Sequence, residues 1–190
     1  MSEARRTEIM EQQQEGITGG ITNINSDHGA IHLGYGALVS DIQTLTNGAT
    51  KEYCMTTPLV LYPHFKNVVL KSLGGSCKLE LIKGATVTVN TGDALNIQNP
   101  NDNATATADM TIKEDPTYSG GTVWTTIYAL SDSTRQTIGN AETSTSDNQE
   151  LVMKNANEEY ILKLTNLTTD TITVAWQGFW YEEPQGVDTL

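Results

Sequence analysis

The clearest metal-binding pattern in this 190-residue chain is a pair of histidines four positions apart, His28 and His32, with Asp27 beside the first. On a helix, this spacing would place both imidazoles on one face, where a metal ion could bind them. However, Gly29 and Gly34 argue against a helix, and no third ligand stands nearby in the sequence. We therefore expect no metal here, and we expect both histidines to lie in turns or to contact another subunit.

Carboxylates occur as adjacent pairs at 114–115, 158–159 and 182–183. Neighbouring residues in a strand point to opposite faces, so these pairs do not predict the facing carboxylates of a glycosidase. The chain also lacks a nucleophile elbow, a phosphate-binding glycine loop and a Cys-x-x-Cys pair. We therefore predict no catalytic residues, no cofactor and no enzymatic activity.

Aromatic residues gather near the C-terminus, at Trp176, Phe179, Trp180 and Tyr181. They could form a stacking platform for a sugar. The alternative is that Trp176 and Trp180 belong to the core while Phe179 and Tyr181 cover it or form an interface, and this is more usual for a terminal strand.

The two cysteines, Cys54 and Cys77, both lie within apolar, strand-like runs. They are either buried free thiols or a disulfide between neighbouring strands that forms after release from the cell. The N-terminus has no apolar run of the kind found in secretory signals, and no stretch is long enough to span a bilayer. These observations predict a soluble protein that is made in a cytoplasm and has no membrane partner.

The composition is acidic and rich in Thr, Asn, Ser and Gly, with a formal net charge of −12 and 18% charged residues. An acidic surface repels phosphate backbones, and no dense basic run is present, so we expect no nucleic-acid partner. Thr favours strands, whereas Asn and Gly favour turns. The composition therefore suits a β-protein better than a helical one.

From about residue 37, apolar residues alternate with polar ones, which predicts strands. Asn47-Gly48 and Gly74-Gly75 each separate two such runs, which predicts two β-hairpins. Because turn signals recur along the whole chain, we predict an all-β fold, an antiparallel β-sandwich or jelly roll. The polar stretches 99–103 and 131–148 are expected to be solvent-facing loops. The residues expected in the core are Leu70, Leu79, Leu81, Ile127, Leu162, Leu164, Val174 and Trp176.

The N-terminal part differs from the rest, because its only helix-like stretch, 1–16, is followed by widely spaced isoleucines. We divide the chain into an extended N-terminal arm (1–30), a β-sandwich domain (31–184) and a short acidic tail (185–190). The arm is either a disordered tail or a segment that becomes ordered against another subunit or surface. The residues that we expect to make such contacts are Ile9, Met10, Ile17, Ile21, Ile24, His28 and His32.

The order of several short motifs between about residues 21 and 183 resembles a known family. The motifs are residues 29–34 with His32-Leu33-Gly34, residues 46–49, Thr57-Pro58, residues 79–87, residues 99–103, residues 162–166 and Trp180-Tyr181-Glu182. This order is similar to that of the small decoration (cement) proteins of tailed-phage capsids, which are encoded beside the major capsid protein. The loop at 99–103 departs from the family pattern because it lacks arginines, so a role for those arginines is not carried over.

The resemblance implies a structural virion protein that is plausibly a homotrimer, sits on the capsid surface and has the major capsid protein as its partner. The alternative is a receptor-binding or glycan-binding fibre module of a virion, built on the same kind of sandwich. The two functions differ in copy number, because a decoration protein covers the whole head and a receptor binder occupies a few positions on the tail.

Overall fold

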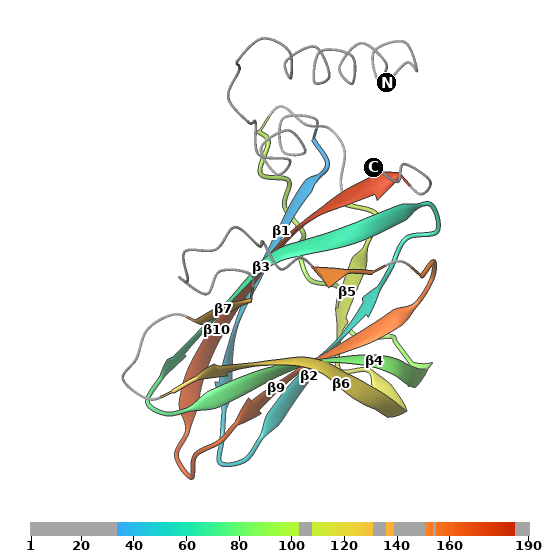
Figure 1. Ribbon diagram of the computed structural model, residues 1–190. Helices are drawn as coiled ribbons and strands as arrows, with labels where there is room; N and C mark the ends of the chain where they lie inside the picture. Colours follow the sequence, from blue (N-terminus) through green and yellow to red (C-terminus); the bar gives the residue numbers. More distant parts are fainter. Residues whose placement is uncertain (1–33, 103–107, 131–135, 139–150, 154, 185–190) are drawn as a thin grey trace.

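The computed structural model describes residues 34–102, 108–130, 136–138, 151–153 and 155–184 (Figure 1). The predicted arm (1–30) and tail (185–190) lie outside these residues, as do residues 31–33 of the predicted sandwich domain. Ten strands make up the described fold: β1 (Gly36–Leu45), β2 (Thr50–Thr56), β3 (Leu61–Leu73), β4 (Cys77–Val89), β5 (Thr111–Glu114), β6 (Thr117–Ala129), β7 (Gln136–Ile138), β8 (Leu151–Val152), β9 (Glu159–Asn166) and β10 (Ile172–Pro184).

The strands form two antiparallel sheets. The first sheet has the order β1-β10-β3-β7, and β8 also pairs with β3. The second sheet has the order β5-β2-β9-β4-β6. No helix occurs in the part of the chain that the structure describes. The predicted all-β, antiparallel sandwich is therefore confirmed.

The chain passes repeatedly from one sheet to the other. The connections β1–β2, β2–β3, β3–β4 and β9–β10 all cross between the sheets. When β5 and β8 are set aside, the remaining eight strands form two four-stranded sheets in a jelly-roll arrangement. Figure 1 shows β1, β10 and β3 running side by side in one layer.

Both predicted hairpins are wrong, although their turns are present. β1 pairs with β10, and β2 pairs with β5 and β9, so Asn47-Gly48 carries the chain between sheets. Gly74-Gly75 likewise joins β3 of the first sheet to β4 of the second. Gly48 and Gly74 have the left-handed φ angles of 62° and 91° that such turns favour. A glycine turn reverses the chain, but burial of apolar faces decides which strand becomes the partner.

One buried side chain, that of Asn166, holds two of these turns together at the end of β9. Its Nδ2 donates to the carbonyl oxygens of Leu45 and Thr46, at 3.1 and 2.9 Å, and to that of Asp170, at 2.7 Å. Its Oδ1 accepts hydrogen bonds from the backbone N–H and the hydroxyl of Thr168, both at 2.8 Å. The β1–β2 and β9–β10 connections are therefore fixed to each other.

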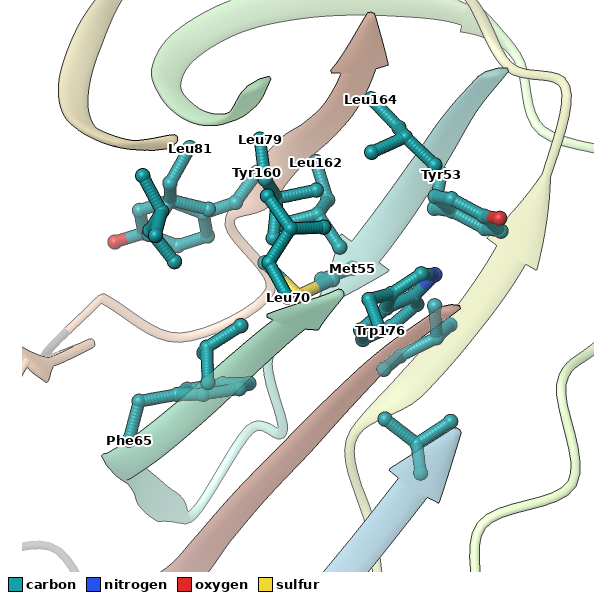
Figure 2. Close-up of a cluster of buried hydrophobic side chains, with 14 of the residues drawn as sticks. Tyr53, Met55, Phe65, Leu70, Leu79, Leu81, Tyr160, Leu162, Leu164 and Trp176 are labelled. Carbon is teal, nitrogen blue, oxygen red and sulfur yellow. The ribbon is translucent and has the colours of Figure 1, made fainter. Parts of the chain in front are cut away.

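The core lies between the sheets, and all eight residues predicted to belong to it are buried, with exposed fractions of 5% or less. Figure 2 shows Leu70 and Trp176 of the first sheet close to Leu162 and Leu164 of the second. The Trp176 ring packs edge-on against Tyr53 across the sandwich, with 5.2 Å between ring centroids. Such a core follows from the two-residue period of the strands, which places alternate side chains on one face.

The segment 93–98 runs from the edge of β5 to the edge of β1, which it meets at Leu38. Its Leu95 N–H donates to the carbonyl of Ile112 at 2.8 Å, on the β5 side. At its other end, Gln98 and Leu38 exchange two backbone hydrogen bonds of 2.8 Å, on the β1 side. The segment therefore bridges the two sheets on this side.

The predicted loop at 131–148 is wrong in one part, because Gln136–Ile138 form β7 and pair with Val68–Leu70 of β3. The rest of that stretch lies outside the described residues. In the predicted loop at 99–103, Pro100 and Asp102 are exposed, whereas Asn99 is half-buried. Asn99 Nδ2 donates to the carbonyl of Gly34 at 2.8 Å, which holds the loop against the beginning of the domain.

Candidate functional site

The seven contact residues predicted in the arm all lie outside the described residues. They are Ile9, Met10, Ile17, Ile21, Ile24, His28 and His32. The interpretation of the histidines as turn or contact residues, and the arm itself, therefore stay predictions. Among the residues that the structure does describe, no group of three or more His, Cys, Asp or Glu side chains could hold a metal ion.

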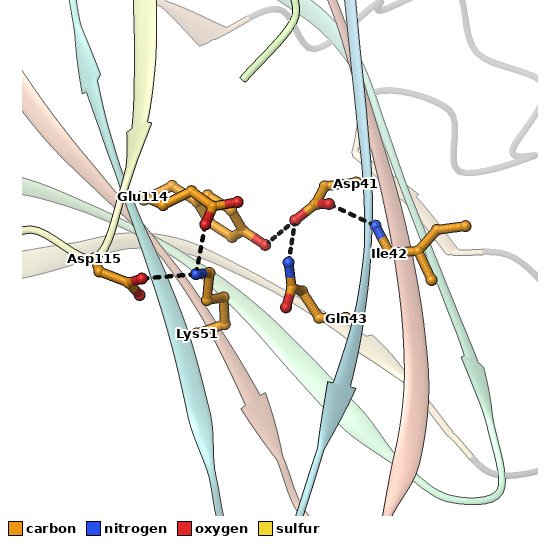
Figure 3. Close-up of polar contacts among 7 residues, drawn as sticks. Asp41, Ile42, Gln43, Lys51, Glu114 and Asp115 are labelled. Atoms are coloured by element: carbon orange, nitrogen blue, oxygen red, sulfur yellow. Dashed lines mark hydrogen bonds and ion pairs between the residues drawn. The ribbon is translucent and has the colours of Figure 1, made fainter. Parts of the chain in front are cut away.

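The carboxylate pair Glu114–Asp115 binds a single cation, Lys51 of β2 (Figure 3). The Lys51 Nζ lies 2.8 Å from Glu114 Oε2 and 2.9 Å from Asp115 Oδ2. The expectation that the two carboxylates point to opposite faces is wrong here, because Asp115 follows the end of β5 and has a left-handed φ of 52°. Burial lowers the pKa of Lys51, but both carboxylates raise it, and the net pKa lies above its usual value. The triad is an ion-paired link between β2 and the end of β5.

A second polar group links the two sheets. Asp41 of β1 accepts hydrogen bonds from the Tyr53 hydroxyl at 2.6 Å and from Gln43 Nε2 at 2.7 Å. Burial, followed by the hydrogen bond to Asp41, raises the pKa of Tyr53, so the phenol stays protonated. Figure 3 shows this group beside the Lys51 triad. The Asp41–Tyr53 hydrogen bond joins the two sheets, whereas the Lys51 triad acts within the second sheet, because β2 and β5 are neighbours there.

The pair Glu182–Glu183 contains a buried carboxylate, because Glu182 is only 3% exposed. Its two oxygens accept hydrogen bonds from the backbone N–H groups of Asp109 and Met110, at 2.8 and 2.9 Å, and from Trp180 Nε1 at 3.2 Å. The carboxylate therefore anchors the chain before β5 to the last strand. Three N–H donors surround its oxygens, a pattern that stabilises a buried charge.

The cysteines are free thiols, and the disulfide alternative is therefore wrong. Cys77 lies in the core between the sheets, whereas Cys54 lies on the opposite face of the second sheet with Ile82 and Ile161. Strand β9 also separates β2 from β4. Burial raises the pKa of the Cys54 thiol to about 11, and Glu159 adds to this shift. Neither thiol is placed as a reactive nucleophile.

The C-terminal aromatic residues do not form an open platform for a sugar. Trp176, Trp180 and Tyr181 are 2%, 0% and 3% exposed, and Phe179 is half-buried. Trp180 stacks on Phe65 within the core, with centroids 5.2 Å apart. The core interpretation is confirmed for both tryptophans, and Tyr181 is also buried.

The two outer faces of the sandwich differ in charge. On the second sheet, the outward positions carry ion pairs, with Glu52 3.3 Å from Lys163 and Lys78 2.8 Å from Glu80. The Tyr118 hydroxyl also donates to Glu52 at 2.9 Å. Solvent-exposed ion pairs of this kind contribute little to stability, and the dehydration of such a surface costs free energy.

One part of the outer face of the first sheet is almost uncharged. The strand register places nine of its residues in three rows of three across β1, β10 and β3. We call these nine residues the β1–β10–β3 face. Lys71 is its one charged residue, seven of the nine residues are exposed and the other two are half-buried. Ile42 and Leu73 are 69% and 62% exposed. The rows are Ser40, Gln177 and Val69; Ile42, Ala175 and Lys71; and Thr44, Thr173 and Leu73.

Sequence reasoning did not identify this face. Within a single strand, the outward-facing residues could be predicted from the two-residue period. Thr173, Ala175 and Gln177 of β10, for example, alternate with buried residues. Their neighbours across the sheet come from residues 40–44 and 69–73, far away in the sequence. The face exists only once the jelly-roll order brings β1, β10 and β3 together.

No protein-family model matches the chain, and no curated protein matches its sequence closely enough to count as a relative. The described residues contain no helix with the length and hydrophobicity needed to cross a membrane. Function is therefore argued from the fold and from the two outer faces of the molecule.

Proposed function

We propose that this protein is a structural component of a virus particle, a decoration (cement) protein. In this proposal, it binds the outside of a tailed-phage capsid as a homotrimer, contacts the major capsid protein and stabilises the contacts between capsomers. The order of sequence motifs described above supports the proposal. The jelly-roll sandwich is compatible with it, since viral capsid proteins and lectins use this architecture, but a fold alone does not decide a function.

The observation that carries the proposal is the β1–β10–β3 face. The cores of protein interfaces are depleted of charge and enriched in apolar groups, because charged side chains are costly to dehydrate. This face presents Ile42, Ala175 and Leu73 among hydroxyl and amide groups, on a chain whose formal charge is −12. Covering this face therefore costs less than covering the ion-paired outer face of the second sheet.

The same charge distribution suits a protein that binds in many copies. The remaining acidic surface makes free copies repel one another, which disfavours clustering away from the shell. Each trimer that touches neighbouring capsomers gains from having several linked contacts. We give the fibre or glycan-binding alternative less weight, because the aromatic residues that would stack on a sugar are buried.

Imaging of phage heads tests this proposal. Heads of the phage that encodes the chain are purified with and without the protein, and purified protein is then added back. We expect density at regular positions over the whole head, which disappears when the protein is missing. Density on the tail alone would indicate the receptor-binding alternative, and no density on the particle would overturn a structural role.

A matched pair of variants tests the surface. Thr173→Glu adds a carboxylate to the β1–β10–β3 face, whereas Thr50→Glu makes the same change at an exposed outward position of β2, on the opposite face. We expect Thr173→Glu to reduce head binding by about tenfold or more and Thr50→Glu to leave it unchanged, since a dehydrated charge is costly. Equal binding of both variants would show that the capsid contacts a different surface.

A further inference from the structure

Strand β6 leaves a long sheet edge uncovered. It has 13 residues, and its pairing with β4 takes up one side. Within the described ranges, no residue pairs with its other side. An edge strand exposes a row of backbone N–H and C=O groups that can pair with another strand.

The other sheet edges contrast with β6. The segment 93–98 pairs with β5 through Leu95 and Asp93, and it meets β1 at Leu38 through Gln98. The edge beyond β3 is formed by β7, which is only three residues long. Covered and short edges are two ways in which proteins avoid unwanted strand pairing. At β6, no residue of the described ranges provides such protection.

The sequence of β6 also lacks the residues that usually block an edge. The strand reads TYSGGTVWTTIYA, with no charged residue and no proline. A register shift beside Trp124 interrupts the ladder, and beyond it Thr125–Ala129 pairs without a break with Cys77–Leu81. Tyr128 is 46% exposed on this regular part, whereas Ile127 is buried. The stretch 125–129 is therefore a regularly paired, uncharged template for one more strand.

We propose that this edge accepts the uncharged part of the N-terminal arm, residues 16–25, from a second copy of the chain. Gly16–Asn25 contains no charged side chain, and its Ile and Thr residues favour extended structure. The nine residues from Asn25 to Gly34 can span up to about 30 Å when extended, which allows the arm to leave its own domain. The added strand gains main-chain hydrogen bonds, as in other cases of strand addition.

Charge favours the arm over direct pairing of β6 with β6 of another copy. Direct pairing would place two acidic domains side by side, whereas an arm lets the domains stay apart. An arm that passes to the next copy also makes a head-to-tail contact, and three such contacts can close into a ring. The inference thus rests on the proposed homotrimer, but it is tested in solution without capsids. Its failure is therefore separate from a failure of capsid binding.

The first test measures assembly by light scattering and native mass spectrometry of full-length chains. Ile21→Asp with Ile24→Asp places charges in the arm strand, and Thr126→Lys places one on β6. We expect both variants to raise the dissociation constant of the oligomer by about tenfold or more. The controls are Ile9→Asp with Met10→Asp, outside the strand segment, and Thr50→Lys on β2, and both should assemble as the wild type does.

The second test uses cysteine pairs in two differently tagged chains. Because Cys54 and Cys77 are buried, new cysteines at Thr22 and Thr126 should be the ones that cross-link. We expect Thr22→Cys of one chain to cross-link to Thr126→Cys of another several-fold more than to Thr50→Cys. A monomeric wild type, cross-links only within one chain, or equal yields for both pairs would overturn the proposal. Loss of assembly in Thr126→Lys alone, with the arm variant unaffected, would indicate β6–β6 pairing instead.

Discussion

Three buried polar residues, Thr57, Asn166 and Glu182, bond mainly to backbone groups. Thr57 exchanges hydrogen bonds with the backbone of Glu158, Asn166 binds three carbonyl oxygens, and Glu182 accepts two backbone N–H groups. A buried polar group without a partner costs about 1–3 kcal/mol, so each of these contacts specifies one position of a connecting segment. The jelly roll thus has its long connections fixed at particular residues.

Trp176 is the residue whose truncation tests the packing of the core. Trp176→Ala should lower the free energy of unfolding by about 3–5 kcal/mol, because it leaves a cavity opposite Tyr53. Urea unfolding measures this loss. Ile42→Ala is the matched control, since Ile42 is 69% exposed and its truncation should change stability by about 0.5 kcal/mol or less. A loss below about 1 kcal/mol for Trp176→Ala would contradict the observed packing.

Cys54 should make stability depend on pH in the alkaline range. Burial raises its pKa from an ordinary value near 9 to about 11, so between these values the native thiol keeps a proton that the unfolded chain releases. Its contribution is complete below about pH 9 and is lost as the pH rises toward 11. The slope of stability against pH should therefore be shallower in Cys54→Ala, by up to about 1.4 kcal/mol per pH unit.

Urea midpoints measured at several pH values on both proteins check this slope. Tyr53, Tyr118 and Tyr160 also have raised pKa values, so the comparison is of two slopes rather than of two absolute stabilities. The tyrosines contribute equally to both proteins and cancel in the difference. Parallel curves for wild type and variant would show that the Cys54 thiol titrates alike in the folded and unfolded states.

At the level of elements, the sequence predicts strands and turns better than strand partners. The core residues of β9, Leu162 and Leu164, could be predicted because a two-residue period places them on one face. The partner of β1 could not be predicted, because β10 lies more than 120 positions further along the chain. Local turn chemistry at Asn47-Gly48 favours a hairpin, and the burial of both sheets against each other overrides it.

The buried carboxylate of Glu182 was equally hard to predict. Glu182 belongs to an acidic pair near the C-terminus, and such residues are rarely buried without a partner. Its partners, the backbone N–H groups of Asp109 and Met110, carry no sequence signal. The β1–β10–β3 face was missed for the same reason, because it depends on strand order rather than on any local pattern.

The segment that closes the sandwich edge depends on the small size of Gly92. A Cβ atom at this position would lie 1.8 Å from the backbone oxygen of Glu114, and no side-chain rotation can relieve a clash with Cβ. Gly92→Ala should therefore displace the segment 93–98 and lower the free energy of unfolding by about 2 kcal/mol or more. Hydrogen exchange should show lost protection at the amides of Leu95 and Glu114, which now bond across this edge.

Gly84→Ala is the matched control for this variant. Gly84 has a φ of +67° but no atom within 4 Å of a Cβ, so it tests backbone strain alone. It should cost about 1 kcal/mol and leave the amides of Leu95 and Glu114 protected. If both variants had the same effect on stability and exchange, close packing at Gly92 would not be what holds the edge closed.

At the scale of the whole molecule, charge and shape assign different tasks to different surfaces. The second sheet carries its ion pairs on the outside, and the β1–β10–β3 face is nearly free of charge. Among the described residues, no strand pairs with β6 on the side away from β4. In the proposed assembly, the first surface stays in solvent, the second meets the capsid and the third holds a neighbouring arm. The first two assignments follow from what each face costs to dehydrate, and the third follows from the unpaired backbone groups of an edge strand.

This division predicts how the binding of heads responds to salt. If the capsid covers an uncharged face, binding does not depend on attraction between opposite charges. Added salt then mainly screens the repulsion between neighbouring copies, each with a formal charge of −12. Occupancy at sub-saturating protein should therefore stay constant or increase between low and high sodium chloride.

Binding held by cations such as Arg5 and Arg6 would weaken as salt increases, because screening acts on that attraction. Measuring the occupancy of binding positions on imaged heads across a salt series distinguishes binding through the uncharged face from binding through these cations. A clear decline in occupancy would place the contact on the basic residues of the arm instead of on the β1–β10–β3 face.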